Sequence, residues 1–278
     1  IAWSGDDCIA IESINNMDST YNYSINYLEV NNATLFSDKA RGIAILNRNT
    51  VSGLSNCNFN NIRIIGYGIN GAGYGIYFSP LATGTAIHNL SFNNIIFTFI
   101  PIKTMAHSFI YFSENNGSVH DITFNNIQYI PSQTNVSNTY LFAIRLLGKV
   151  YDVVFNNVVL KNIPHHAGTS YCIQMEKVSR ITFNNLVLSK LESTGSMISI
   201  DRSNYITFNN IQILGKYDDS TNTVTVQAPI GIRLRKTSNG KDTKHIKING
   251  IINCTTPVVY ENGQDAYAST NTITLINE

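Results

Sequence analysis

A short motif recurs along the chain about every 30 residues, and this repeat limits the folds that the sequence can adopt. Six copies carry Phe-Asn-Asn between apolar positions, and two weaker copies flank them. The first Asn of each copy, or its equivalent, falls at residues 31, 60, 93, 125, 156, 184, 209 and 249. Each copy is a short alternating strand that leads into Asn-Asn and a second strand, without the 3.6-residue periodicity of a helix. The repeat therefore predicts an all-β parallel β-helix, a solenoid of about nine coils.

The Asn-Asn pairs indicate where each coil turns. Asn tolerates the left-handed backbone conformation that a sharp corner requires. Because the pairs recur once per coil, they are expected to lie above one another along the solenoid. Their side-chain amides could then bond to one another as a ladder.

A second family of alternating strands lies between the Asn-Asn copies. Alternation puts every second residue inside, so Ile9, Ile11 and their equivalents are predicted to build the core. The residues between them form an outer face of two columns. From the first coil on, its pairs are Ala10/Glu12, Ala44/Leu46, Tyr77/Ser79, Tyr111/Ser113, Arg145/Leu147, Gln174/Glu176, Ser199/Asp201 and Arg233/Arg235. Aromatic, acidic and arginine side chains in two columns suit a polysaccharide groove, and a plain solvated face is the alternative.

No linker divides the chain, so we predict one parallel β-helix over residues 1–263. Residues 264–278 break the repeat and are predicted to form a C-terminal capping segment. The segment 215–231 is expected to be a loop that extends one coil. Because the chain begins almost within its first strand, we expect N-terminal coils to be missing upstream of Ile1.

Composition excludes some partners. The formal net charge is +1 and only 13% of residues are charged, so no basic footprint for nucleic acid exists. No apolar run reaches the roughly 20 residues that span a membrane, and we expect no membrane insertion.

The four cysteines and six histidines show no metal-ligand spacing, so no metal and no cofactor are expected. Cys8 and Cys172 open strands five coils apart, too far for a disulfide bond, and are predicted to be core residues.

The stretch Ser4-Gly5-Asp6-Asp7-Cys8 places two carboxylates at the turn that leads into the first outer-face strand. A Gly-Asp-Asp turn is ordinary by itself. This motif, within a β-helix repeat that covers nearly the whole chain, resembles the pectin-lyase-like β-helix hydrolases and best the polygalacturonases of glycoside hydrolase family 28. The resemblance implies the right-handed form of the β-helix and an inverting hydrolysis, with Asp6 as general acid and Asp7 as base. Such a reaction needs one protonated and one ionised carboxyl group with room for a water molecule.

The chain departs from that family at three places. The family's Asn-Thr-Asp motif would lie before Ile1. Residues 40–42 are Ala-Arg-Gly where the family has Gly-His-Gly, and residues 77–79 are Tyr-Phe-Ser where it has Arg-Ile-Lys. The resemblance therefore implies a polysaccharide hydrolase and leaves the sugar open.

The same architecture resembles bacteriophage tailspike depolymerases, which degrade capsule or O-antigen. This resemblance implies a homotrimer and a location outside the cell or on the virion surface. Its substrate would lie across the outer face, with Tyr77 and Tyr111 as stacking platforms and Glu176 beside Arg145; a surface ion pair is the plain alternative for the last two. The predicted substrate-binding residues are Glu12, Arg41, Tyr77, Tyr111, Arg145 and Glu176.

Two other functions remain open. A polysaccharide lyase would need cationic neutralisation of a uronate, which Arg145, Arg233 and Arg235 could supply, and a base such as His107. A non-catalytic adhesin or structural β-helix would use the outer face for binding alone, and Asp6-Asp7 would then be turn residues. Loss of product on neutralising either Asp would distinguish the hydrolase from the adhesin.

Overall fold

The chain folds as a parallel β-solenoid, which confirms the predicted all-β class. The computed structural model describes residues 1–13, 24–48, 53–66, 73–98, 106–130, 140–163, 171–190, 195–214, 216–218, 223–226, 228–235, 242–262 and 268–276. Within these ranges there is no α-helix, and none of these residues forms a helix long and apolar enough to span a membrane.

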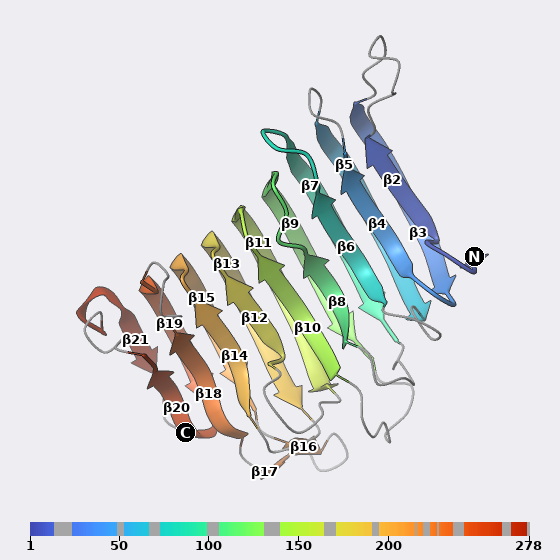
Figure 1. The fold of residues 1–278 in the computed structure, drawn as a ribbon. Coiled ribbons are helices and arrows are strands. Elements are labelled where there is room, and N and C mark those ends of the chain that lie inside the picture. Colours follow the sequence, from blue (N-terminus) through green and yellow to red (C-terminus); the bar gives the residue numbers. More distant parts are fainter. Residues whose placement is uncertain are drawn as a thin grey trace.

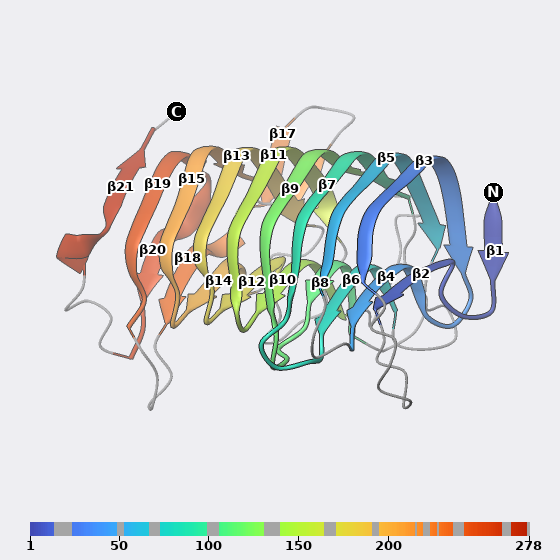
Figure 2. The same ribbon diagram turned by 90° about the horizontal axis from the view of Figure 1, so that it is seen from above.

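Two parallel sheets face each other along the length of the molecule (Figure 1). The first sheet contains ten strands, in the order β1 (Ala2–Ser4), β3 (Ile25–Ser37), β5 (Leu54–Gly66), β7 (Ala86–Phe97), β9 (Ser118–Tyr129), β11 (Val150–Ile163), β13 (Ser179–Lys190), β15 (Asn204–Ile213), β19 (Lys244–Ile252) and β21 (Thr272–Leu275). The second contains nine, in the order β2 (Ile9–Ser13), β4 (Arg41–Asn47), β6 (Tyr74–Pro80), β8 (Ala106–Phe112), β10 (Tyr140–Leu147), β12 (Ile173–Glu176), β14 (Ser196–Asp201), β18 (Ala228–Arg235) and β20 (Cys254–Tyr260). Figure 2 shows the coils stacked along one axis, with β1 at one end and β21 at the other.

Each long strand of the ten-stranded sheet bends at two corners. The second Asn of each Asn-Asn pair lies at one corner, with φ between 55° and 57° in Asn32, Asn61, Asn94, Asn126, Asn157, Asn185 and Asn210. The other corner lies five residues upstream, where φ is between 53° and 86° in Tyr27, Asn56, Asn89, Asp121, Asp152, Arg180, Tyr205 and His245. Asn and Asp tolerate this region best, and they occupy half of the upstream column.

The Asn-Asn pairs also form two ladders of side-chain hydrogen bonds. From Asn60 to Asn209, the first Asn of each pair donates to the equivalent Asn of the preceding coil, over 2.7–2.9 Å. From Asn61 to Asn210, the second Asn does the same over 2.8–3.1 Å. The predicted ladder is therefore present in duplicate, and it holds the corner in register from coil to coil.

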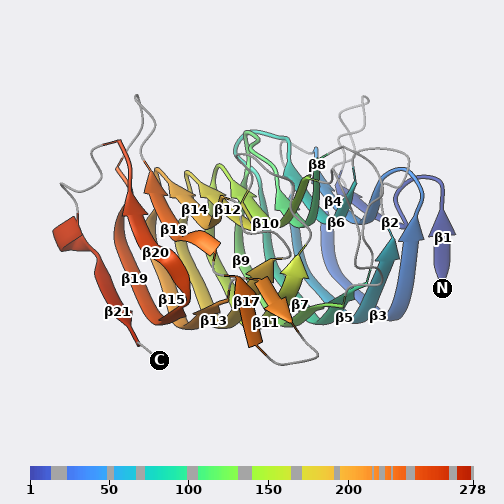
Figure 3. The ribbon, with the colours of Figure 1, turned by 90° about the horizontal axis from the view of Figure 1, so that it is seen from below.

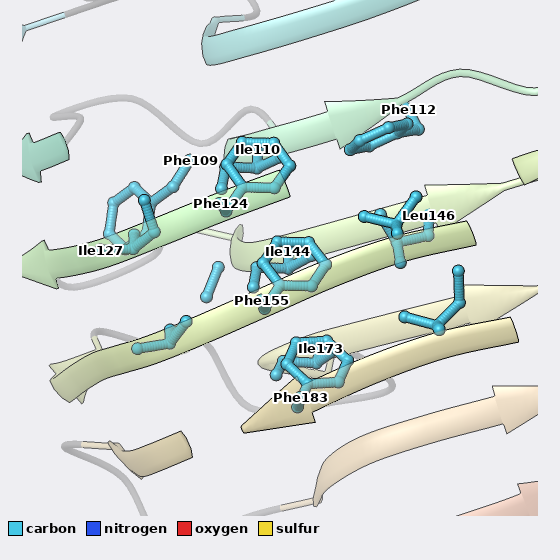
Figure 4. Close-up of a cluster of buried hydrophobic side chains, with 14 of the residues drawn as sticks. Phe109, Ile110, Phe112, Phe124, Ile127, Ile144, Leu146, Phe155, Ile173 and Phe183 are labelled. Carbon is cyan, nitrogen blue, oxygen red and sulfur yellow. The ribbon is translucent and has the colours of Figure 1, made fainter. Parts of the chain in front are cut away.

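The core lies between the two sheets and is built around a stack of phenylalanines. Phe59, Phe92, Phe124, Phe155, Phe183 and Phe208 follow one another with ring centroids 4.5–5.1 Å apart and rings nearly parallel. All six are fully buried. Figure 4 shows Phe124, Phe155 and Phe183 on successive coils, with isoleucines of the nine-stranded sheet next to them in the same interior. Burial of each such ring stabilises the fold by about 1.5–3 kcal/mol.

The strands of the nine-stranded sheet do not alternate strictly. At the start of these strands two consecutive residues point inwards, as in Gly75-Ile76, Phe109-Ile110 and Cys172-Ile173, which are all buried. From there on the predicted alternation holds: Phe78 and Phe112 face the core and stack on each other at 4.1 Å. Before the pair Gly75-Ile76, Tyr74 keeps partial exposure, whereas Ser108 and Tyr171, which precede the other two pairs, are buried.

Several smaller predictions can be compared with the structure. Cys57, Cys172 and Cys254 are buried, Cys8 is partly buried, and all four are free thiols. This confirms the prediction that Cys8 and Cys172 do not form a disulfide bond. Within the segment expected to be a loop, β16 (Lys216–Asp218) and β17 (Thr223–Val226) pair as an antiparallel hairpin outside the two sheets (Figure 3). The expected loop bound at residue 231 is wrong, because residues 228–231 already belong to β18 of the nine-stranded sheet. β21 pairs with β19 at the edge of the ten-stranded sheet. That residues 264–278 cap the solenoid remains a prediction.

Candidate functional site

The Gly-Asp-Asp turn joins β1 to β2 and is held by the next coil. Ser37 Oγ donates a hydrogen bond to the Asp6 carbonyl oxygen at 2.6 Å, and the Asp6 amide donates to Ser4 Oγ at 3.0 Å. The Cys8 amide donates to the Arg41 carbonyl oxygen at 3.0 Å. The backbone of the turn is therefore fixed, while the side chain of Asp6 is exposed to solvent.

Asp7 is bound by Arg41 through both carboxylate oxygens. The Arg41 amide donates to Asp7 Oδ1 at 3.1 Å, and Arg41 Nη1 donates to Asp7 Oδ2 at 2.9 Å. The Asp7 side chain is only 12% exposed and that of Arg41 31%. Charge-assisted hydrogen bonds of this kind are stronger than neutral ones. Asp7 is therefore held by two groups of the same residue, and this pairing orients the Arg41 guanidinium group.

Arg41 leads directly to a cluster of tyrosines on β6 and β8. Its guanidinium carbon lies 4.8 Å from the centre of the Tyr77 ring. Tyr77 stacks on Tyr74 at 5.1 Å, and Tyr74 lies 4.7 Å from Tyr111. On the far side, the Arg145 guanidinium lies 4.9 Å from the Tyr111 ring. We call this line of side chains the tyrosine strip: Arg41, Tyr74, Tyr77, Tyr111 and Arg145.

The strip is partly buried, which affects its hydroxyl groups. Partial burial raises the pKa of both Tyr74 and Tyr111, and the nearby tyrosine Tyr77 contributes to the rise for each. Their hydroxyl groups therefore stay protonated at neutral pH and can donate as well as accept hydrogen bonds. The strip thus offers apolar ring surface, hydroxyl groups and guanidinium donors along one line.

The other predicted site residues lie outside this strip. Glu12 pairs with Arg48 at 2.7 Å, and Glu176 pairs with Arg202. Arg145, predicted to lie beside Glu176, instead donates from Nε to Gln174 Oε1 at 3.1 Å. The structure brings Asp7, Arg41, Tyr77, Tyr111 and Arg145 together, and it assigns Glu12 and Glu176 to separate ion pairs.

The outer face is narrower than the two predicted columns. In the second column several members are at most 8% exposed, namely Leu46, Ser79, Ser113, Leu147 and Asp201. In the first column Ala44 and Ser199 are also buried, whereas Tyr77, Tyr111 and Arg145 keep partial exposure. Between β6 and β12 the partly exposed members of the first column are therefore consecutive: Tyr77, Tyr111, Arg145 and Gln174.

Strict alternation missed Tyr74, which it places inside. Tyr74 precedes the inward pair Gly75-Ile76 and so reaches the outer face beside Tyr77. The signal was Gly75 itself: a Cβ atom there would lie 2.4 Å from Phe97 Cε1 and 2.6 Å from the Phe109 carbonyl oxygen. Only glycine fits at this inward position, and a Gly within a strand often marks such a close approach.

Comparison with protein-family models, curated proteins and solved structures found no match, so the chain's own residues carry the functional argument. Among the side chains that the structure describes, no three of His, Cys, Asp or Glu gather where they could hold a metal ion. His107, the lyase candidate, belongs to β8, but its side chain lies outside the part described. Oligomeric state and location stay predictions.

Proposed function

We propose that the protein binds a polysaccharide along the tyrosine strip and hydrolyses it at Asp6 and Asp7. The observation that carries the proposal is the continuous line of contacts from Asp7 through Arg41 and the three tyrosines to Arg145. A line of aromatic and guanidinium groups that begins at a pair of carboxylates is the arrangement that a polymer-cleaving enzyme needs.

The shape of the strip favours an extended ligand. Its members come from β4, β6, β8 and β10, which are successive neighbours in the nine-stranded sheet. Neighbouring strands are about 4.8 Å apart, so the strip and the turn before β2 together extend over roughly 20 Å along the solenoid axis. Tyrosine rings offer flat apolar surface to the faces of sugar rings, and their hydroxyl groups hydrogen-bond to the rim. The ligand is therefore proposed to run along the axis, across the strands.

The two carboxylates differ in surroundings, which supports different roles. Asp7 accepts two hydrogen bonds from Arg41 and suits the ionised partner that activates water. Asp6 is exposed, and its side chain could donate a proton to the glycosidic oxygen. These roles match those that the resemblance to glycoside hydrolase family 28 implies. Pectic and capsular polysaccharides lie outside the cell, so we propose an extracellular or virion-surface location for the protein.

One observation favours a second function, glycan binding without cleavage. Both oxygens of Asp7 are already engaged by Arg41, and the pairing holds the first two outer-face coils together. On this alternative Asp7 is a structural residue of the turn, and the tyrosine strip alone carries the function.

The test follows cleavage and binding together on a panel of pectic and capsular polysaccharides. Reducing ends and the absorbance of unsaturated uronates are recorded for the wild type and for Asp6→Asn, Asp7→Asn and Tyr77→Ala. Glu29→Gln is the matched control, because Glu29 is an exposed carboxylate of the first coils on the other sheet. We expect new reducing ends without unsaturation and a loss of about 100-fold or more in rate for either Asp variant. Tyr77→Ala should weaken binding, and Glu29→Gln should change neither rate nor binding.

Other outcomes are equally informative. Binding that is lost in Tyr77→Ala, without product from any substrate, would establish the non-catalytic alternative. Unsaturated product would replace hydrolysis by elimination. A chain that neither binds nor cleaves any member of the panel would overturn the assignment of the strip to polysaccharide.

A further inference from the structure

A second candidate site lies on the outer surface of the ten-stranded sheet. An open hollow of about 580 Å³, called the cavity below, lies there and is lined by residues of five neighbouring strands from β7 to β15. The lining residues are Asn89, Asp121, Thr123, Asp152, Val154, Arg180, Thr182 and Tyr205. None of them belongs to the tyrosine strip, which is built on the other sheet.

The corners of the solenoid explain why a hollow forms here. Asn89, Asp121, Asp152, Arg180 and Tyr205 all belong to the upstream corner column with positive φ. Thr123, Val154 and Thr182 are aligned with one another on adjacent strands, two residues beyond the corner. The longer side chains of the corner, called the wall below, and the shorter side chains two residues beyond it line the cavity together.

The wall carries several hydrogen-bonding groups in fixed positions. Arg180 donates from Nε and Nη2 to the two carboxylate oxygens of Asp152 at 2.6 and 2.8 Å. His120 Nδ1 lies 2.7 Å from Asp121 Oδ2. An arginine has five N–H donors and a carboxylate has about four acceptor positions, so each pair keeps unused donors or acceptors for a ligand.

Stacked rings hold these groups in place. His88 stacks on His120 at 5.2 Å, and His120 stacks on Tyr151 at 4.7 Å. Arg180 lies over Tyr151 at 5.1 Å, and Tyr205 stacks on His245 at 4.7 Å. The site is therefore preorganised by ring contacts between neighbouring coils, which reduces the entropy that a ligand must overcome.

The charge of the lining limits the class of ligand. Two carboxylates and one guanidinium group give a formal charge of −1, which disfavours anionic sugars and phosphate groups. Carboxylates accept hydrogen bonds from vicinal hydroxyl groups, and an arginine donates to sugar oxygens. Val154 is an apolar lining residue that suits C–H surface. A cavity of this volume lies within the range of small-molecule sites.

We propose that this cavity is a binding site for a neutral saccharide, one or two units long. It lies on the opposite sheet from the tyrosine strip and would act without catalysis. A protein with both sites could hold a polymer, or two neighbouring polymers, at two points and gain avidity that neither site provides alone. The proposal depends on the cavity residues only, and it stands whether or not Asp6 and Asp7 cleave a substrate.

The test is a binding titration with the neutral disaccharides maltose, cellobiose and lactose, followed by saturation-transfer NMR and calorimetry. At least one is expected to bind with a Kd of about 1 mM. Tyr205→Ala should weaken that binding about tenfold, because a stacked aromatic group is lost from the wall. Asp121→Asn should weaken it as well, because the amide keeps the shape and loses an acceptor.

Tyr27→Ala is the matched control, since Tyr27 is an exposed tyrosine of the same corner column and lies outside the cavity. Tyr27→Ala should leave disaccharide binding unchanged. All titrations are repeated in a Tyr77→Ala background, which weakens any binding by the tyrosine strip, so that the remaining binding reports the cavity. Thermal unfolding of each variant checks that the solenoid is intact. Absence of binding up to about 10 mM of every disaccharide would overturn the proposal. So would binding that survives Tyr205→Ala and disappears in Tyr77→Ala, because the sugar would then lie on the tyrosine strip.

Discussion

At the scale of single residues, the two Asn of each repeat have different tasks. The first is half-buried and contributes to one ladder, whereas the second is exposed, contributes to the other ladder and adopts positive φ. Asn is the residue that combines both properties, because its side chain bonds locally and it tolerates the left-handed region. Across all eight copies of the repeat, the second position is Asn in seven and glycine, Gly250, in the eighth, and all eight adopt positive φ.

A pair of substitutions at Asn126 separates the two tasks. Asn126 donates to Asn94 and accepts from Asn157, with φ at 57°. Asn126→Gly loses the ladder bonds and keeps the backbone conformation, whereas Asn126→Ala loses the bonds and strains the backbone. We expect Asn126→Ala to reduce the free energy of unfolding by about 1 kcal/mol more than Asn126→Gly, measured by denaturant unfolding. Equal losses would show that the corner does not demand positive φ.

A second residue-scale prediction concerns Asp152 in the cavity. Hydrogen bonds from Arg180 lower the pKa of the Asp152 carboxyl group. Arg180→Ala should therefore raise this pKa, which carboxyl-carbon NMR titration would measure. Because the pKa is lower in the folded chain than in the unfolded chain, the pair stabilises the fold above the ordinary aspartate pKa and loses that contribution as pH falls through the lowered value. An unchanged pKa in Arg180→Ala would contradict the ion pair.

At the scale of strands, the long strands were the easier part to predict. The Phe-Asn-Asn repeat predicted their order and parallel pairing, because every copy shows the same alternation. The burial of its phenylalanines in one stack was found only in the structure. The outer-face strands were harder, because two consecutive residues point inwards at their start, as Gly75 and Ile76 do. Period-two reasoning therefore found Tyr77 and Tyr111 and missed Tyr74. Period-two reasoning also could not predict the ion-pair partners of Glu12 and Glu176. These partners, Arg48 and Arg202, lie just after the ends of β4 and β14, where the alternation stops.

Gly75 is predicted to be essential to both packing and the tyrosine strip. A Cβ atom there would come too close to Phe97 and to the Phe109 carbonyl group. Gly75→Ala should reduce the free energy of unfolding by about 1–3 kcal/mol, as overpacking does, and should weaken polysaccharide binding by displacing Tyr74 and Tyr77. Gly5→Ala is the stability control, because nothing lies within 4 Å of a Cβ atom at Gly5. Equal stability of the two variants would show that the strand can shift without cost.

The phenylalanine stack provides a second prediction at this scale. Phe124 packs against both Phe92 and Phe155 and is fully buried. Phe124→Ala should reduce the free energy of unfolding by about 3–5 kcal/mol through lost burial and the cavity left behind. Gln128→Ala, at an exposed position of the same strand, should change it by no more than about 0.5 kcal/mol. Chemical unfolding of both variants measures the difference, and a small loss at Phe124 would mean that the stack collapses around the gap.

At the scale of the whole molecule, each coil is stabilised by its neighbours. In both sheets each strand pairs only with the strands of the adjacent coils, from one end of the solenoid to the other. Stability in such a stack is close to a sum of coil and interface contributions. The sequence predicted this architecture because a period near 30 residues is visible in one dimension. The cavity on the ten-stranded sheet was not predicted, because it depends on the second corner, which only the backbone reveals.

Hydrogen exchange can test how far a defect spreads along the stack. In Phe124→Ala, amide exchange should accelerate in β7, β9 and β11, and it should stay at the wild-type rate in β18 and β20. This local response is expected because β18 and β20 share no strand pairing with the altered coil. Uniform acceleration throughout the chain would mean that the solenoid opens as one cooperative unit.

The alignment of the tyrosine strip across successive coils has a consequence for how such a protein can change. The members of the strip come from four successive coils, with Tyr74 and Tyr77 on the same strand. The coil rise of about 4.8 Å sets the interval from one coil's members to the next. Duplication of one coil would lengthen the strip by one interval, and deletion would shorten it, while the chemistry of the remaining positions stayed the same. The length of the tyrosine strip and the chemistry of its residues can therefore change independently of each other in this fold.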